Sequence, residues 1–237
     1  MKKKLSRELN LLDIICVATG AMISSGLFIL PALAFAKAGP AVIVSYLIAG
    51  VLCIPTLLSK AELTTAMPES GGDYFYIMRG FGPLIGTLAG LSSWLSLSFK
   101  GAFALVGMGV YLRLVTSIPL ETIAVFCCLF FVLLNIIGVK EAVKFQTFLV
   151  FGFIIILTVY VFWGVKSINP SNFSPFFSHG KASVFATASF VFISFGGLTK
   201  VAALAGETKN PGKNLPLGMI LSLLITMLIY VWVIFVT

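Results

Sequence analysis

The sequence predicts an all-α protein that crosses a lipid bilayer about seven times. Its mean hydropathy is +1.09, and only 10% of its 237 residues are charged. This composition excludes a water-soluble domain. Apolar runs of membrane-spanning length follow one another along the chain, and polar stretches separate them. The sequence therefore indicates a polytopic helical membrane protein.

A basic head at residues 1–10 precedes the first apolar run. The predicted membrane spans are residues 11–36, 41–63, 83–112, 123–139, 145–165, 182–205 and 217–236. A polar stretch at residues 64–82 separates the second span from the third. The fifth and sixth spans are separated by a loop at residues 166–181, in which two X-Pro pairs break regular structure.

The remaining connections are short. Residues 37–40 join the first two spans, and residues 113–120 join the third and fourth. A tight charged turn, Lys140–Lys144, is expected between the fourth and fifth spans. The turn E-T-K-N-P-G-K-N-L-P leads from the sixth span into the seventh. Successive connections therefore alternate between the two sides of the membrane.

Lysine and arginine are divided unevenly between these two sides. One side carries Lys2, Lys3, Lys4, Arg7, Lys60, Arg79, Lys140, Lys144, Lys209 and Lys213, and the opposite loops carry Lys37, Arg113, Lys166 and Lys181. The positive-inside rule then places the N-terminus in the cytoplasm. The expected location is the cell membrane. The asymmetry accounts for much of the net charge of +8, so no nucleic-acid partner is expected.

The middle of the first span is a poor helix. Residues 20–31 read G-A-M-I-S-S-G-L-F-I-L-P, with three small residues, Ser24, Ser25 and Gly26, in succession. Pro31 lacks a backbone N–H and disfavours helical backbone in the residue before it. We expect one half-helix to end near Ile23 and a second to begin near Leu27.

A helix broken at this depth leaves backbone groups that lipid cannot satisfy. Free N–H groups would attract a carboxylate and free carbonyls an ammonium, so the break suits a zwitterion. The alternative interpretation is that the small residues let another helix approach closely. A second stretch, I-S-F-G-G-L at residues 193–198, parallels I-S-S-G-L-F at residues 23–28. Such paired, Gly-interrupted spans favour a transporter binding site.

Three motifs resemble those of the amino acid–polyamine–organocation permeases. G-A-M-I-S-S-G-L-F resembles the first-helix motif of that superfamily, and P-E-S-G-G-D-Y-F-Y with Glu62 resembles its loop between spans two and three. A-G-E-T-K-N-P-G-K-N-L-P resembles the loop after span six. The three motifs occur in the family's order and extend over most of the chain.

This resemblance implies a leucine-transporter-type fold of two inverted five-helix repeats, with helices 1 and 6 broken. Residues 11–165 would form the first repeat, residues 166–181 an extracellular loop and residues 182–237 the start of the second. The implied activity is proton- or sodium-linked uptake or exchange of amino acids or related amines. The second repeat is expected to be incomplete, so that the chain would need a partner chain with the missing helices.

The resemblance also implies a substrate site formed by both broken spans. The matching positions are Ile23, Ser24, Ser25, Gly26, Ile193, Gly196 and Gly197. Ser25 and Gly26 match the positions that receive the substrate carboxylate, and the carbonyl of Ile23 matches one that receives the ammonium. Ser24 stands where the family usually has glycine. Because Ile193 is not aromatic, a lid over the substrate would come from Phe195 or Phe190, although core packing is the simpler role for both.

Lys100 lies near the centre of the third span. A charged side chain there costs at least about 2.5–3.5 kcal/mol, so it should face the interior of the helix bundle. Its functional interpretation is a coupling cation, and its structural interpretation is a lysine held by backbone carbonyls. Both remain open from the sequence.

No cofactor or metal site is expected. The four cysteines lie in apolar segments without C-x-x-C spacing, and the only histidine, His179, lies in a loop. A non-transporting membrane subunit or a truncated remnant is the alternative to a transporter. An intramembrane enzyme is a remote alternative, because no span carries a histidine that would activate Ser24 or Ser25.

Overall fold

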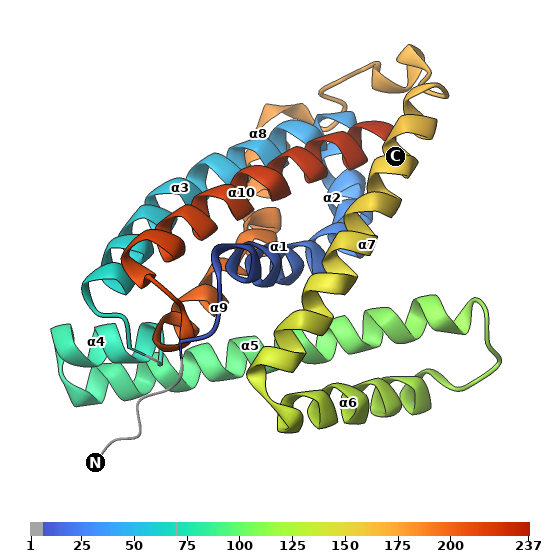
Figure 1. Cartoon of the computed structure of the whole chain (residues 1–237). Coiled ribbons are helices and arrows are strands. Elements are labelled where there is room, and N and C mark those ends of the chain that lie inside the picture. Colours follow the sequence, from blue (N-terminus) through green and yellow to red (C-terminus); the bar gives the residue numbers. More distant parts are fainter. Residues whose placement is uncertain (1–6, 70) are drawn as a thin grey trace.

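A computed structural model describes residues 7–69 and 71–237, and helices account for most of them (Figure 1). The α-helices are α1 (Leu11–Phe28), α2 (Leu30–Ala38), α3 (Val42–Ala66), α4 (Asp73–Phe81), α5 (Pro83–Arg113), α6 (Leu120–Ile137), α7 (Val139–Val165), α8 (Gly180–Val191), α9 (Leu198–Ala203) and α10 (Pro211–Val236). Four short 3₁₀ helices are η1 (Gly39–Ala41), η2 (Pro170–Phe173), η3 (Phe192–Phe195) and η4 (Ala205–Glu207).

Six helical stretches in the described part of the chain are long and apolar enough to cross a membrane. They are Leu30–Ala66, Pro83–Arg113, Leu120–Ile137, Lys140–Val165, Gly180–Ala203 and Pro211–Val236, and Leu11–Ser24 is a shorter apolar helix. Large apolar side chains such as Trp94, Phe126, Phe148 and Trp163 lie exposed on α5, α6 and α7. Such surfaces are stable in lipid rather than in water. The chain is a multi-pass membrane protein.

The buried core lies where α1 is surrounded by other helices. In Figure 1, α3 and α10 run beside each other along one side of α1, and α5 and α6 form a pair at the lower edge that α7 joins to the rest. The side chains of Tyr46, Met22 and Tyr230 are almost completely buried. The rings of Tyr46 and Tyr230 pack edge to face at 5.2 Å. This core positions α1 against the sixth span.

The first span is interrupted, but not at the predicted place. α1 continues through Ser24, Ser25 and Gly26, and the break falls at Ile29. Pro31 explains the difference because it occupies the first turn of α2, where its missing N–H is not needed. Proline therefore begins the second half-helix here. The predicted half-helix from Leu27 is wrong by about one turn.

The sixth span shows the interruption predicted near Gly196 and Gly197. α8 ends at Val191, η3 narrows the backbone to 3₁₀ geometry, and α9 begins at Leu198. The N–H of Gly196 donates to the carbonyl of Ile193 at 3.0 Å. Two non-α turns therefore separate the halves of this span.

Three connections differ from the prediction. The polar stretch at residues 64–82 contains α4, whose amphipathic sequence was not recognised as a helix. Lys140–Lys144 belongs to the first turns of α7, and the chain turns at Gly138 with φ of 148°. Such a positive φ favours glycine. α10 begins at Pro211, before the predicted start, because proline suits the first helical position.

The described end of the basic head lies against two other polar segments. The backbone N–H groups of Glu8 and Leu9 donate to the carbonyl of Glu207, and the backbone N–H of Lys209 donates to the carbonyl of Leu9. Lys140 forms an ion pair with Glu8 at 2.7 Å. Three segments that the charge count assigned to one side of the membrane therefore meet. Lys2, Lys3 and Lys4 lie outside the described residues.

Candidate functional site

A cavity of about 1150 Å³ lies between α5 and the interruption of the sixth span. From α5 it is lined by small, polar and aromatic side chains, and from the sixth span by Phe190, Ile193 and Gly196. Gly71 and Gly72, which precede α4, and Asp73, its first residue, close part of its wall. Lys100 also lines this cavity. The structure thus brings together four of the residues singled out from the sequence.

The ammonium of Lys100 is buried and has no hydrogen-bond partner among the described residues. It lies beside the helix interruption, because a Cβ placed on Gly196 would be 4.0 Å from its Nζ. Lys100 therefore faces the bundle interior, as its charge requires. The structural interpretation predicted carbonyls around the ammonium, and none among residues 7–69 and 71–237 is a hydrogen-bond partner of it.

The only carboxylate in the cavity lining as described is Asp73, and its charge is already paired. Lys60 on α3 donates to Asp73 at 2.9 Å. The neighbouring hydroxyl of Tyr76 is buried without a partner in the described structure. Burial, with a smaller contribution from Asp73, raises the pKa of Tyr76 to about 12. The ion pair holds the start of α4 against α3 beside the cavity.

Most of the predicted ligands on α1 lie in helix packing rather than in this cavity. Ile23 is 3% exposed, and the Ser24 hydroxyl donates to the carbonyl of Ala21 within the helix. The side chain of Ser25 lies outside the described part of the structure. A Cβ on Gly26 would collide with the hydroxyl of Tyr230 and lie 2.8 Å from Cβ of Ser194. Gly26 is therefore a point of close helix approach.

Tyrosine hydroxyls satisfy carbonyls along the C-terminal half of α1. Tyr46 donates to the carbonyl of Gly26 at 3.0 Å, and Tyr230 donates to that of Met22 at 2.6 Å. Tyr111 donates to the carbonyl of Phe28 at 3.0 Å. A helix end inside a membrane needs such partners.

Gly197 lies close to the backbone of the first interrupted span. A Cβ at this position would be 2.7 Å from the amide nitrogen of Met22 and 2.8 Å from the carbonyl carbon of Ala21. Gly197 and Gly26 thus follow the packing interpretation of the small residues. Gly196, one residue earlier, faces the cavity instead.

The two candidate lid residues have different surroundings. Phe195 is 1% exposed and packs edge to face on Tyr230 at 5.3 Å, so it belongs to the core. Phe190 lines the cavity, and the ammonium of Lys37 lies 5.3 Å from its ring centroid. Of the two, only Phe190 is placed to cover a ligand.

The sequence profile of the family described as amino acid permease matches residues 9–237. The chain belongs to this family. It is 31% identical to the branched-chain amino acid permease of Bacillus subtilis, over 98% of this chain and 54% of that protein. It is 29% identical to the methylthioribose transporter of the same bacterium, over 97% of this chain and 54% of that protein.

A third relative in Bacillus subtilis is a serine/threonine exchanger, 28% identical over 97% of this chain and 54% of that protein. The chain thus spans about half the length of the curated relatives it matches. The named relatives are transporters or permeases, and their names differ in the substrate that they give.

Two features of this family member were missed in the sequence. Ser93 and Ser96 line the cavity together with Lys100, and their spacing places all three on one helix face. That spacing is visible in S-S-W-L-S-L-S-F-K. The tyrosines that bond to α1 were also missed, although a buried tyrosine in a span must find a partner for its hydroxyl.

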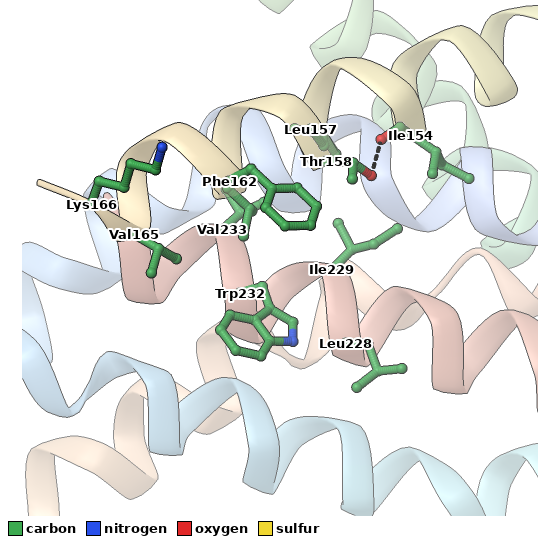
Figure 2. Close-up of a pocket in the computed structure, with 11 residues that line it drawn as sticks. Ile154, Leu157, Thr158, Phe162, Val165, Lys166, Leu228, Ile229, Trp232 and Val233 are labelled. Atoms are coloured by element: carbon green, nitrogen blue, oxygen red, sulfur yellow. Dashed lines mark hydrogen bonds between the residues drawn. The ribbon is translucent and has the colours of Figure 1, made fainter. Parts of the chain in front are cut away.

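A second hollow, of about 570 Å³, lies between α7 and α10 (Figure 2). Its walls are apolar side chains that include Phe162, Ile229 and Trp232. Thr158 contributes a hydroxyl that is already bonded to the carbonyl of Ile154 at 2.7 Å, and Lys166 lies at one end. It contains none of the predicted site residues, and its walls offer little to a zwitterion.

The described residues contain no group of three or more His, Cys, Asp or Glu side chains that would hold a metal ion. The cavity beside Lys100 is instead mostly apolar, with a few polar groups. It offers one ammonium, serine hydroxyls and the backbone of an interrupted helix.

Proposed function

We propose that the protein is a secondary active transporter that takes up or exchanges amino acids or related small amines across the cytoplasmic membrane. The observation that carries this proposal is the interrupted sixth span of an amino acid permease family member, which borders a cavity containing Lys100. Irregular backbone at membrane depth is stable where it faces protein or a water-filled cavity. Transporters bind substrates at such positions.

The proposed substrate site uses backbone groups of both interrupted spans. Its residues are Ile23, Ser24, Ser25, Gly26, Ile193, Gly196 and Gly197. The N–H groups near Ser25 and Gly26 would receive the substrate carboxylate, and carbonyls of Ile193 and Gly196 would receive the ammonium. Support comes from the close approach of Gly197 to α1 and from the cavity at Gly196. Binding at Gly26 requires Tyr230 to move away.

The proposed coupling is to protons or another cation, with Lys100 as the coupling residue. A buried ammonium without a partner is electrostatically costly, so its protonation responds to any charge that enters the cavity. Binding of a substrate or cation would thereby change the affinity of Lys100 for its proton. This linkage would connect substrate movement to the proton gradient.

The proposed topology places the N-terminus in the cytoplasm. The meeting of Glu8 with Lys140, and of Leu9 with the segment around Thr208, supports a common side for these basic segments. In this proposal, residues 11–165 form the first inverted repeat, and the second begins at residue 182.

The test is uptake by proteoliposomes that contain the purified protein. Radiolabelled amino acids are screened with an imposed proton gradient, with a sodium gradient and with neither. We expect at least one amino acid to accumulate only when a gradient is present, or to exchange against internal amino acid. An amino acid methyl ester should compete far less well than the free acid. Failure of every amino acid to bind or exchange would contradict the proposal.

A further inference from the structure

The cavity beside the sixth span carries an excess of positive charge. Among its lining side chains, Asp73 and Lys100 are the two that bear a charge at neutral pH. The charge of Asp73 is neutralised by Lys60, which contacts it at 2.9 Å. Lys200 on α9 lies close enough to repel the ammonium of Lys100. No lining carboxylate is therefore left to balance Lys100.

A buried ammonium without a partner is an unusual arrangement. Buried charges are normally paired, because their desolvation is otherwise uncompensated. The Nζ atom of Lys100 is buried, lacks a hydrogen-bond partner in the described structure and faces a cavity large enough for a small molecule. An anionic group of a ligand in this cavity would supply the missing partner.

We propose that Lys100 determines the substrate class, so that the cavity accepts amino acids with a second carboxylate and rejects cationic ones. This inference rests on the proposed function, and it further specifies that the transported amino acid carries a negatively charged side chain. The relatives described above are named for branched-chain amino acids, for methylthioribose, or for serine and threonine. An acidic substrate would distinguish this chain from those proteins.

The geometry of α5 fits a ligand that extends away from the helix interruption. Gly196 and the ammonium of Lys100 lie next to each other at one point of the cavity. Ser96 and Ser93 follow along the same face of α5, about one and two turns away, and both line the cavity. A side-chain carboxylate in this part of the cavity can pair with Lys100 and accept hydrogen bonds from the serine hydroxyls.

The same charge acts against a cationic side chain. A lysine or arginine substrate would bring a second cation beside Lys100 in a site of low dielectric, where repulsion is stronger than in water. A neutral amide of the same shape, as in glutamine, would form weaker hydrogen bonds than a carboxylate. The expected order of affinity is therefore glutamate, then glutamine, then lysine.

The test is isothermal titration calorimetry of the purified protein at neutral pH with L-glutamate, L-glutamine and L-lysine. Glutamate should bind at least about tenfold more tightly than glutamine, the change expected for one charge-assisted hydrogen bond. In the Lys100→Gln variant this preference should fall below about twofold, and L-lysine should bind to the variant more tightly than to the wild-type protein. Lys100→Arg should retain the preference, because it retains the charge.

Lys166→Gln is the matched control, because it removes the same charge from the exposed end of the α7–α10 hollow. It should retain the preference for glutamate. Equal or tighter binding of glutamine by the wild type would overturn the inference, and this measurement does not depend on any variant folding. Loss of the preference in Lys166→Gln, or its survival in Lys100→Gln, would also overturn it. If neutral amino acids bind and acidic ones do not, only this inference fails; if no amino acid binds, the proposed function fails with it.

Discussion

The two interrupted spans satisfy their backbone in different ways. At the end of α1, the hydroxyls of Tyr46 and Tyr111 donate hydrogen bonds to the carbonyls of Gly26 and Phe28. At the interruption of the sixth span, the backbone tightens into 3₁₀ geometry, and Gly196 borders a cavity. The backbone at Gly26 is thus covered by protein, whereas Gly196 faces open space.

This difference teaches that similar sequence signals need not mark equally accessible sites. I-S-S-G-L-F and I-S-F-G-G-L both contain small residues at membrane depth. Only the second segment has its glycine beside a buried ammonium. A ligand can therefore reach the second interruption directly, whereas the first requires side chains to move.

The largest expected effect comes from comparing two single variants, each of which adds one methyl group to a glycine of the second interruption. Gly197→Ala places a Cβ 2.7 Å from the backbone of Met22, whereas Gly196→Ala meets its nearest atom, the carbonyl of Ile193, at 3.1 Å. Overpacking against backbone costs about 1–3 kcal/mol. Gly197→Ala should lower the thermal unfolding midpoint in detergent and broaden the size-exclusion peak.

Gly196→Ala is the matched control for this change. It should preserve the folded protein and reduce ligand binding, because the added methyl group enters the cavity near Lys100. Equal loss of stability in the two variants would contradict the division of these neighbours between packing and cavity.

The next effect tests the ammonium at the second interruption. Lys100→Met should leave expression and fold intact, because it replaces a buried unpaired charge with an apolar side chain. Gradient-driven accumulation in proteoliposomes and its pH dependence should disappear, while exchange of bound amino acids continues. The other charged groups that act in or near the cavity are Asp73 in its lining, Lys60 paired with Asp73, and Lys200, which repels Lys100. If the Lys100→Met variant still accumulates amino acid with unchanged pH dependence, one of these groups, and not Lys100, carries the coupling.

A smaller effect tests the enclosure of the first interruption. Gly26→Ala should destabilise the protein because the new methyl group meets the hydroxyl of Tyr230. Adding Tyr230→Phe removes that hydroxyl and should restore part of the lost stability. The measurement is a double-mutant cycle of thermal unfolding. Additive losses in the double variant would show that the two groups do not compete for one space.

Much of the fold could be predicted because apolar run length and polar interruptions are properties of local sequence. α3, α5 and α7 lie close to the predicted spans. α4 was missed because a short amphipathic helix in a polar stretch lacks the length signal of a span. The break at Ile29 was misplaced because Pro31 can either end one helix or begin the next, and its local sequence favours neither.

The candidate site was less accessible to prediction. The position of Lys100 followed from charge alone, since a cation in the middle of a span must face inward. The role of Tyr230 could not be predicted, because it contacts Met22, which is 208 residues away in the chain. The different surroundings of Gly196 and Gly197 depend on the crossing of α1, which no local pattern specifies.

The smallest expected effect compares two tyrosines at the first interruption. Tyr46→Phe leaves the carbonyl of Gly26 without its hydroxyl donor inside the core, whereas Tyr111→Phe does the same to Phe28 at a half-exposed position. Interhelical hydrogen bonds in membranes contribute about 0.6 kcal/mol on average and up to about 1.7 kcal/mol. Tyr46→Phe should approach the upper value and Tyr111→Phe should remain below the average, because a carbonyl near the surface can find another donor. Unfolding of both variants by denaturant in mixed micelles measures this difference. A larger loss for Tyr111→Phe would mean that the first interruption is held mainly from α5 rather than from the core.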